Sequence, residues 1–306
     1  MPKFGLGTWL SQPGQVQKAV EHAISNGYRH IDCAHCYANQ EEVAVAIRNK
    51  IADGTVCRED LFITTKLYNI FHRAENVQEG IDINLKQLGL DYIDLLLIHW
   101  PVAFKFTDER DMEPLDMETM KMAVDNDDSA HYLNCWNKMI ELREQSGYDQ
   151  KIKSIGVSNF NIEMIKNLLE NSSYVPDANQ IEGHPYLIQK ELTKFCQDNK
   201  IQIISYSPLG NPSISSWNGH KKILENDLVL ELAEKYEKNN AQILIKFCMQ
   251  RGNVCIPKSV TESRIVENSE VFDFQISEED MESLYGLDCG IRYCNPPWSH
   301  SKWWPF

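Results

Sequence analysis

Short apolar segments alternate with amphipathic segments along most of this 306-residue chain. The apolar segments are continuous runs typical of strands buried on both faces of a parallel sheet. The segments between them carry apolar residues at helical spacing, as Val16, Ala19, Val20 and Ala23 do in the first one. Predicted strands cover residues 4–9, 29–33, 61–66, 93–98, 153–157, 178–181, 202–206 and 254–257, and predicted helices cover 16–26, 40–52, 75–88, 131–145, 161–170, 189–199, 226–238, 241–251 and 261–268. This alternation predicts an α/β fold of the closed (β/α)8 or TIM-barrel type, since each connection is long enough for a right-handed crossover.

We expect residues 1–306 to form a single domain, because no linker-like stretch divides the chain. An open doubly wound sheet is the alternative, but the Gly-x-Gly-x-x-Gly that would favour it follows none of the predicted strands. Residues 101–130 are acidic and irregular, which predicts a surface insertion or a loop that borders the substrate. The aromatic tail from Asp288 to Phe306 is expected to cover an apolar surface near the mouth of a site at the carboxyl end of the barrel.

The composition limits which kinds of molecule the protein can be expected to bind. The formal net charge of -14 argues against nucleic acid, which needs a basic surface to neutralise phosphates. The 9 cysteines are odd in number and scattered, and the start of the chain lacks a signal-peptide pattern. No apolar run approaches the roughly 20 residues that span a membrane. We therefore expect a cytoplasmic protein with reduced cysteines that acts as a monomer on a small molecule, away from membranes.

Three predicted strands end in ionisable residues instead of turn residues. Asp32 and Tyr37 lie at the end of the stretch GYRHIDCAHCY. Lys66 lies at the end of LFITTKL, and His99 lies at the end of YIDLLLIHWP. If these strands are neighbours in one parallel sheet, the four side chains converge at its carboxyl edge, where barrels and open α/β sheets place their active sites.

These four residues suit the reduction of a carbonyl group. Tyr37 would donate the proton, and the ammonium of Lys66 is expected to lower the pKa of the phenol, while Asp32 holds Lys66 in place. His99 would donate a hydrogen bond to the carbonyl oxygen, and the hydride would come from a cofactor. Each residue also has an ordinary structural interpretation as packing or a salt bridge, but four at consecutive strand ends favour a site. A metal site built on His30, His35 and His99 is rejected, because the neighbouring residues supply no ligand set of known spacing.

The chain resembles the aldo-keto reductase superfamily over nearly its whole length. The matching stretches are GLGTW, GYRHIDCAHCYANQEEV, ITTKLYN, LLLIHWP, IGVSNF, NQIEGHPYL, YSPLG and IPKSVTESRIVEN. The resemblance implies a barrel that binds NADPH (or NADP+) in extended form without a Rossmann fold. It also implies that Asp32, Tyr37, Lys66 and His99 are the catalytic tetrad.

The resemblance further implies a set of cofactor-binding residues. Ser158, Asn159 and Gln180 match those that hold the carboxamide, Tyr206 matches the ring stacked on the nicotinamide, and Ser207 and Leu209 match the pyrophosphate loop. The cofactor-binding residues expected elsewhere are Thr8, Trp9, Lys258, Ser259, Val260, Thr261, Arg264, Glu267 and Asn268. A lysine, two hydroxyls and an arginine at a helix start make an anion site that suits the 2′-phosphate of NADPH, although Ser and Thr are also ordinary N-caps.

The substrate pocket is expected to be lined by Trp9, Cys36, Tyr68, His99, Trp100 and Trp217 and by parts of the tail. Aromatic walls with one polar corner suit a small aldehyde or ketone, although Trp9 and Trp100 are as readily explained as core. Tyr68 stands where the family often has Trp, and only MPKF precedes GLGTW, where members usually begin with a hairpin that caps the barrel. The predicted function is NADPH-dependent reduction of aldehydes, aldoses or ketones by an aldehyde or aldose reductase type of oxidoreductase. The alternative is a non-catalytic cofactor sensor or structural protein on the same fold.

Overall fold

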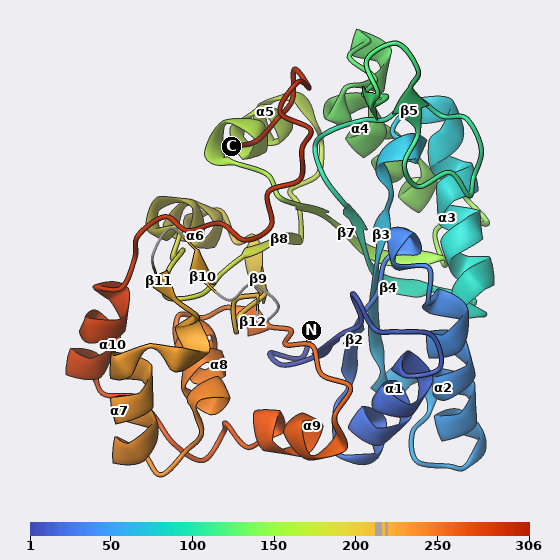
Figure 1. The fold of residues 1–306 in the computed structure, drawn as a ribbon. Coiled ribbons are helices and arrows are strands. Elements are labelled where there is room, and N and C mark those ends of the chain that lie inside the picture. The colour runs from blue at the N-terminus through green and yellow to red at the C-terminus, as the bar shows by residue number, and fades with distance from the viewer. Residues whose placement is uncertain (212–215, 218–219) are drawn as a thin grey trace.

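In the computed structural model, eight parallel strands form one curled sheet that helices surround (Figure 1). The structure describes residues 1–211, 216–217 and 220–306. The strands of this sheet, in spatial order, are β1 (Leu6–Gly7), β2 (His30–Asp32), β3 (Phe62–Leu67), β4 (Ile93–Ile98), β7 (Ile152–Ser158), β8 (Ala178–Glu182), β9 (Gln202–Tyr206) and β12 (Val254–Cys255). Their spatial order follows their order in the chain, as successive right-handed crossovers require.

Contacts between β1 and the end of the chain's last barrel strand close the sheet. Phe4 bridges Cys255 and Gly7 bridges Lys258, both in the parallel sense. The amide of Gly7 donates to the carbonyl of Pro257 at 3.0 Å, and the amide of Cys255 donates to the carbonyl of Lys3 at 3.0 Å. The predicted (β/α)8 barrel is therefore confirmed. The last strand stops short of the predicted 257, because Pro257 has no N–H to donate to a ladder.

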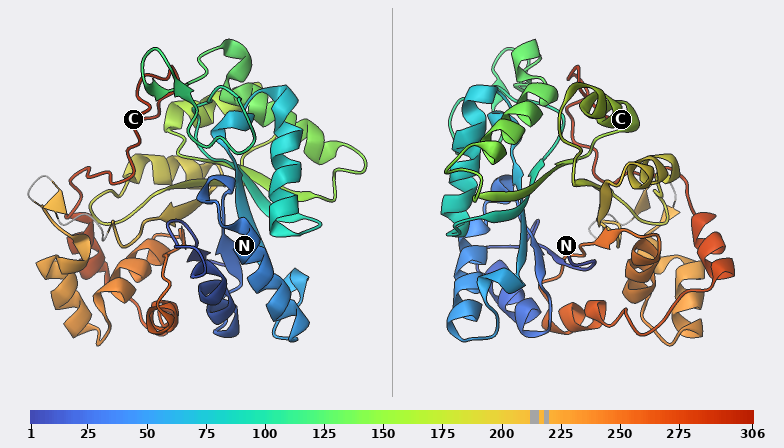
Figure 2. Two further views of the ribbon diagram at one scale, coloured as in Figure 1. Left: turned by 45° about the vertical axis from the view of Figure 1, so that its right-hand side comes forward. Right: turned by 180° about the vertical axis from the view of Figure 1, so that it is seen from behind.

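The helices lie outside the sheet, with α1, α2 and α3 on one side and α7 and α8 on the other (Figures 1 and 2). Their bounds are α1 Val16–Ser25, α2 Gln40–Ala52, α3 Ala74–Leu88, α4 Tyr132–Glu144, α5 Ile162–Asn171, α6 Lys190–Asp198, α7 Asp227–Lys235, α8 Asn240–Gln250, α9 Glu262–Ser269 and α10 Glu278–Tyr285. Helix α3 ends at Gly89, whose φ of 61° is the left-handed conformation that glycine adopts without strain. Among the described residues, no helix is long and apolar enough to cross a membrane.

The apolar core has two layers. Alternate residues of β4 face opposite ways: Leu95 and Leu97 join a small cluster made of strand residues inside the barrel, and Leu96 and Ile98 join the larger cluster under the helices. At the amino end of the barrel, Phe4 is buried against Tyr28 and Phe272. Phe272 itself remains 66% exposed.

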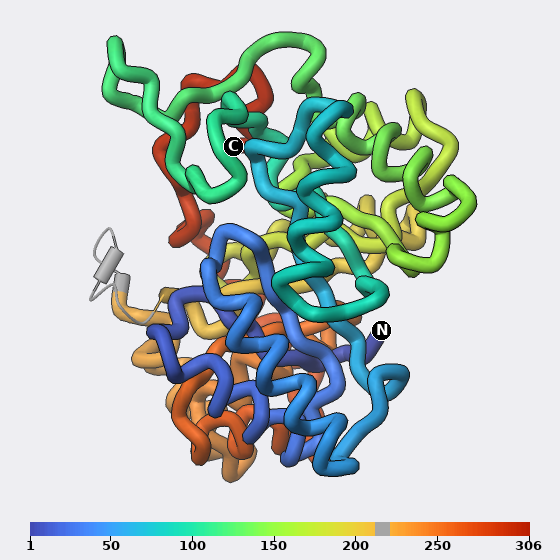
Figure 3. Tube along the Cα trace, turned by 90° about the vertical axis from the view of Figure 1, so that its right-hand side faces the viewer, coloured from blue at the N-terminus to red at the C-terminus, as the bar shows by residue number. Residues whose placement is uncertain are grey.

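The insertion and the tail meet on one side of the molecule (Figure 3). Residues 101–130 contain a hairpin, β5 (Leu115–Asp116) and β6 (Lys121–Met122), that the sequence did not predict. Asn126 joins the insertion to the tail, since its side chain donates to the carbonyl of His300 and accepts from the amide of Lys302. The tail covers apolar surface as expected, because Trp303 is buried in the core cluster beneath the helices.

Candidate active site

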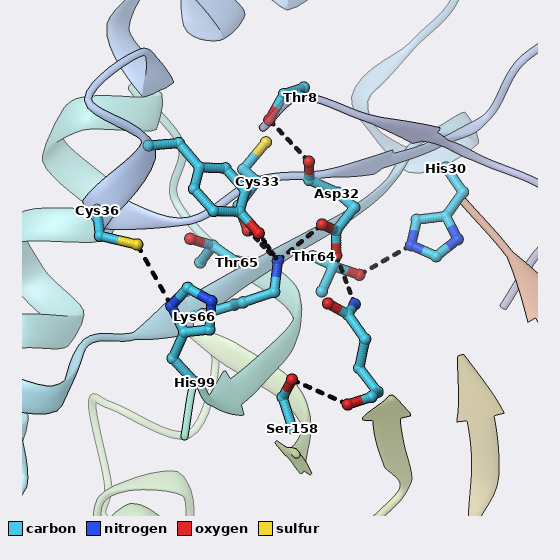
Figure 4. Close-up of polar contacts among 12 residues, drawn as sticks. Thr8, His30, Asp32, Cys33, Cys36, Thr64, Thr65, Lys66, His99 and Ser158 are labelled. Atoms are coloured by element: carbon cyan, nitrogen blue, oxygen red, sulfur yellow. Dashed lines mark hydrogen bonds and ion pairs between the residues drawn. The ribbon is translucent and has the colours of Figure 1, made fainter. Parts of the chain in front are cut away.

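The carboxyl ends of β2, β3 and β4 bring the four predicted catalytic side chains together. Asp32 is the last residue of β2, and Lys66 lies in β3. Tyr37 ends the 3-10 helix η1 (His35–Tyr37), and His99 directly follows β4. The strands are parallel neighbours, with Asp32 opposite Thr64 and Lys66 opposite Leu97. Figure 4 shows the resulting cluster around Lys66.

The ammonium of Lys66 is the centre of the cluster. It donates to Asp32 Oδ2 at 2.7 Å, to the carbonyl of Cys33 at 2.8 Å and to Tyr37 Oη at 3.1 Å. Lys66 is fully buried, so its three donors are all satisfied by protein atoms. Gln180 Nε2 donates to the second carboxylate oxygen of Asp32 at 2.7 Å. A buried charge pair with this many hydrogen bonds holds the Lys66 ammonium at a fixed place beside the Tyr37 oxygen.

The expected direction of the Tyr37 pKa is wrong. Burial raises the pKa of the Tyr37 phenol well above its ordinary value, and the Asp32 carboxylate raises it further. Both effects disfavour a phenolate, and the Asp32 charge offsets the nearby ammonium. Tyr37 therefore holds its proton in this structure, as a proton donor must before it acts.

His99 is held neutral. Burial lowers the pKa of its imidazole well below the ordinary value, and the positive charge of Lys66 lowers it further, with a smaller contribution from His72. The ring packs edge-on against Tyr37, with centroids 5.8 Å apart, and its Nδ1 lies 3.5 Å from Cys36 Sγ. A neutral imidazole carries one N–H, so this ring can donate one hydrogen bond.

The predicted carboxamide residues adjoin the cluster. Ser158, the last residue of β7, donates to the carbonyl of Gln180 at 2.9 Å. Asn159 donates to the carbonyl of His99 at 3.0 Å and accepts from the hydroxyl of Tyr206 at 2.8 Å. Hydroxyl and amide groups at this edge are of the kinds that pair with a carboxamide, and the half-buried Tyr206 ring offers an aromatic face. These residues fit the nicotinamide end of the predicted cofactor.

The predicted adenosine-end residues gather where β12 leads into α9. Ser259 and Asn268 are buried, whereas Lys258, Thr261 and Arg264 are exposed. Thr261 is the N-cap of α9, but its side chain caps no amide. Among the described residues, the guanidinium of Arg264 forms no ion pair, and burial lowers the pKa of Lys258. The Lys258 ammonium donates to the carbonyl of Leu10 at 3.3 Å. A cation without an ion pair, beside helix amides that the N-cap side chain leaves free, suits a phosphate.

The remaining cofactor positions vary in their surroundings. Thr8 is buried and donates to the carbonyl of Asp32 at 2.8 Å. Ser207 has a φ of 48°, and its carbonyl accepts from the amide of Gly210 in a tight turn that contains Leu209. Val260 packs on the core just before α9, and Glu267, in the second half of α9, accepts from Asn239.

The predicted substrate-pocket residues fall into two groups. Trp9 is 44% exposed, with its ring 6.5 Å from that of Tyr37, and Tyr68 lies 6.1 Å from the His99 ring. Trp100 is buried, stacked on Trp304 of the tail. Trp9 and Tyr68 therefore border the tetrad directly, whereas Trp100 packs against the tail. Trp217 lies in β10 (Ser216–Trp217), and its side chain is outside the described part of the chain.

The three histidines weighed as metal ligands have other partners, which for His99 is Cys36 Sγ. His30 Nε2 pairs with Thr64 Oγ1 at 2.9 Å, and His35 contacts Gln87 and the carbonyl of Glu109. Within residues 1–211, 216–217 and 220–306, no group of three or more His, Cys, Asp or Glu residues is arranged to hold a metal ion.

Sequence reasoning missed a buried carboxylate that fixes the tail. Glu182, the last residue of β8, accepts from the amides of Tyr293 at 2.8 Å and Cys294 at 2.9 Å, and from His184 Nε2 at 2.8 Å. The signal was present, because Glu182 directly follows the predicted strand 178–181 and is an ionisable residue at a strand end. Glu182 thus connects the barrel edge to the tail.

Comparisons with known proteins agree with this geometry. The Aldo/keto reductase family profile matches residues 3–288. Aldo-keto reductase family 1 member A1-A of Danio rerio is 42% identical over 299 residues, which are 97% of this chain and 89% of that protein. The human family 1 member A1 is also 42% identical, with the same shares covered. The solved aldose reductase of Schistosoma japonicum has a TM-score of 0.91 and 38% identity, covering 100% of this chain and 95% of that one. The chain therefore belongs to the aldo/keto reductase family, whose members are oxidoreductases that act on carbonyl groups.

Proposed function

We propose that the protein reduces aldehydes, and also aldoses or ketones, to alcohols with NADPH. The observation that carries this proposal is the chain of contacts from Asp32 through the Lys66 ammonium to the Tyr37 hydroxyl, at 2.7 and 3.1 Å. It sets a protonated phenol beside a fixed positive charge, at the barrel end where such folds carry their chemistry. The relatives are named as aldose reductase and as aldo-keto reductases, which supports the same reaction class.

Each tetrad residue has a distinct part in the proposed reaction. NADPH, when bound, supplies the hydride that adds to the carbonyl carbon. Tyr37 transfers its phenolic proton to the carbonyl oxygen as negative charge develops there, so that the alcohol leaves uncharged. Lys66 stabilises the phenolate left behind until solvent returns a proton, and Asp32 holds Lys66 in place. His99 donates a hydrogen bond to the carbonyl oxygen and orients it.

The cofactor preference follows from the cations near α9. Lys258, Ser259, Thr261 and Arg264 offer charge and hydroxyl groups to an anion in a protein of formal net charge -14. The 2′-phosphate of NADPH is absent from NADH, so this cluster favours NADPH. Ser158, Asn159, Gln180 and Tyr206 would hold the nicotinamide end.

We further propose that residues 1–306 act as one catalytic domain, as a monomer in the cytoplasm. All nine cysteines are free, which suits a reducing compartment. Sedimentation at micromolar concentration tests the monomer.

The proposed function is tested by the loss of reduced-nicotinamide absorbance with a panel of aldehydes, aldoses and ketones. Production of the alcohol is measured in parallel, and NADPH is compared with NADH. We expect turnover with NADPH on at least the small aldehydes. Tight NADPH binding without turnover of any carbonyl would favour a sensing or structural protein instead.

A further inference from the structure

The His99 ring has one hydrogen-bond partner among the described residues. That partner is the thiol of Cys36, whose Sγ lies 3.5 Å from Nδ1, within the range for bonds to sulfur. The ring is otherwise enclosed by Tyr37 and Tyr68, both edge-on. Its second nitrogen, Nε2, points to the Lys66 side of the site (Figure 4). The state of Nδ1 therefore decides what Nε2 presents to the site.

The contact between Cys36 and His99 has a preferred direction. Burial raises the pKa of Cys36 to about 12, so the sulfur keeps its proton, and the lowered pKa of His99 keeps the imidazole neutral. The other titratable groups near the ring are Lys66 from β3, Tyr37 from η1, and Tyr68 and His72 on either side of η3 (Asn69–Phe71). Of these groups, Lys66 and His72 disfavour a charged ring. An imidazole nitrogen is a good acceptor, whereas a thiol sulfur is a weak one. The weakness of sulfur as an acceptor favours donation from the S–H to an unprotonated Nδ1.

We propose that Cys36 is a positioning residue for His99: its thiol donates to Nδ1 and so keeps the ring proton on Nε2, facing the reacting carbonyl. This inference rests on the proposed function. In the opposite tautomer, Nε2 would present a lone pair to the carbonyl oxygen and repel it. With the proton on Nε2, the site offers two donors, Tyr37 Oη and His99 Nε2, to an oxygen that has two lone pairs.

The local fold ties both donors to one short turn. Cys36 and Tyr37 are neighbours in η1, and His35 of the same turn is fixed by Gln87 Oε1 at 3.1 Å and by the carbonyl of Glu109 at 3.0 Å. Lys66 fixes the other end of the turn through Tyr37 Oη. Because η1 is held at both ends, the distance between the Cys36 thiol and the proton donor is set by the backbone.

The tautomer can be observed without any turnover. In protein labelled with 15N-histidine, long-range proton–nitrogen spectra distinguish a protonated Nε2 from a protonated Nδ1, and loss of signals in His99→Asn assigns the ring. We expect wild type and Cys36→Ser to hold the proton on Nε2, and Cys36→Ala to shift the ring towards a mixture of both tautomers. Cys135→Ala is the control, since it removes a buried thiol on α4, outside the site. A wild-type ring protonated on Nδ1, or a Cys36→Ala ring unchanged from wild type, overturns the proposal.

Kinetics supply the second readout. Loss of one weak hydrogen bond predicts a kcat about 2- to 10-fold lower in Cys36→Ala with KM for NADPH unchanged, and recovery in Cys36→Ser. Recovery by Ser separates the donor role from pocket shape, because Ala and Ser both shorten the side chain. If wild type turns over no carbonyl while the spectra show Nε2 protonated, the proposed function fails and the assignment of the tautomer stands. Equal kcat in all three proteins would overturn the role of Cys36 in the reaction.

Discussion

Glu182→Gln tests whether one buried carboxylate holds the tail over the site. The side chain of Glu182 is fully buried and accepts from three donors: the amides of Tyr293 and Cys294, and His184 Nε2. Glutamine has nearly the same shape but carries no charge. Its amide nitrogen is a donor and would face one of these three donors, so that hydrogen bond would be lost. Hydrogen bonds to a charged group contribute about 1.5–3 kcal/mol, and we expect the tail to lose roughly that much.

The loss is local, so local opening is the quantity to measure. Since about 1.4 kcal/mol is a factor of ten, amide exchange at Tyr293 and Cys294 should become about 10- to 100-fold faster in Glu182→Gln. The acceleration of exchange at the amides of β4 should be much smaller. Mass-spectrometric hydrogen exchange on a peptide spanning 289–297 provides the measurement. Glu170→Gln, an exposed carboxylate on α5, is the control. Unchanged protection of Tyr293 and Cys294 in Glu182→Gln would refute the idea that this carboxylate anchors the tail.

Three further predictions follow from other contacts. Arg264→Ala should weaken NADPH binding about 10-fold and leave NADH binding unchanged, as measured by quenching of Trp fluorescence. Arg110→Ala, at an exposed position, is the control, and an equal loss for both cofactors would rule out recognition of the 2′-phosphate by Arg264. Tyr68→Phe removes the hydrogen bond from the Tyr68 hydroxyl to the carbonyl of Met112 at 2.7 Å, which contributes about 0.5–1.5 kcal/mol. Amide exchange across residues 107–113 should therefore accelerate, while the global free energy of unfolding hardly changes. Unchanged exchange across these residues would show that Tyr68 does not fix the insertion. Burial lowers the pKa of His72 to about 3, from about 6.5 in the unfolded chain, so unfolding below pH 6.5 takes up a proton. The stability that this group contributes above pH 6.5 is lost as the pH falls towards 3, by roughly 1.4 kcal/mol per pH unit. Urea unfolding at pH 7 and pH 5 measures this slope; a slope no smaller in His72→Gln would contradict the assignment.

The elements that sequence predicted well are those with a repeating physical pattern. The ranges predicted for β4 and β9 match the structure because each run contains consecutive apolar residues, Leu95 to Ile98 in β4 and Ile203 and Ile204 in β9. Placing Lys66 and His99 at the ends of such runs predicted their convergence, since parallel strands share a carboxyl edge. Their catalytic roles stay predictions.

Other features depend on distances that the sequence does not express. The rise in the Tyr37 pKa was missed because the sequence shows which charges are near in the chain but not how deeply the phenol is buried. The partners of Glu182 are backbone amides more than a hundred residues away, which no side-chain pattern marks. Helix α10 was not predicted, although the sequence carries a signal for its start. Ser277 precedes three acidic residues, and its side chain caps the amide of Asp280.

The central claim is that Tyr37 donates the proton, and Tyr37→Phe tests it most directly. Reduction of a small aldehyde by NADPH is compared in wild type, Tyr37→Phe and Tyr132→Phe, a buried tyrosine outside the tetrad, with cofactor binding measured by fluorescence in each. Removal of a general acid typically costs about 10²- to 10⁴-fold in rate. We expect such a loss of kcat in Tyr37→Phe with NADPH binding intact, and near wild-type activity in Tyr132→Phe. A Tyr37→Phe protein that binds NADPH and reduces the aldehyde at the wild-type rate would contradict the account.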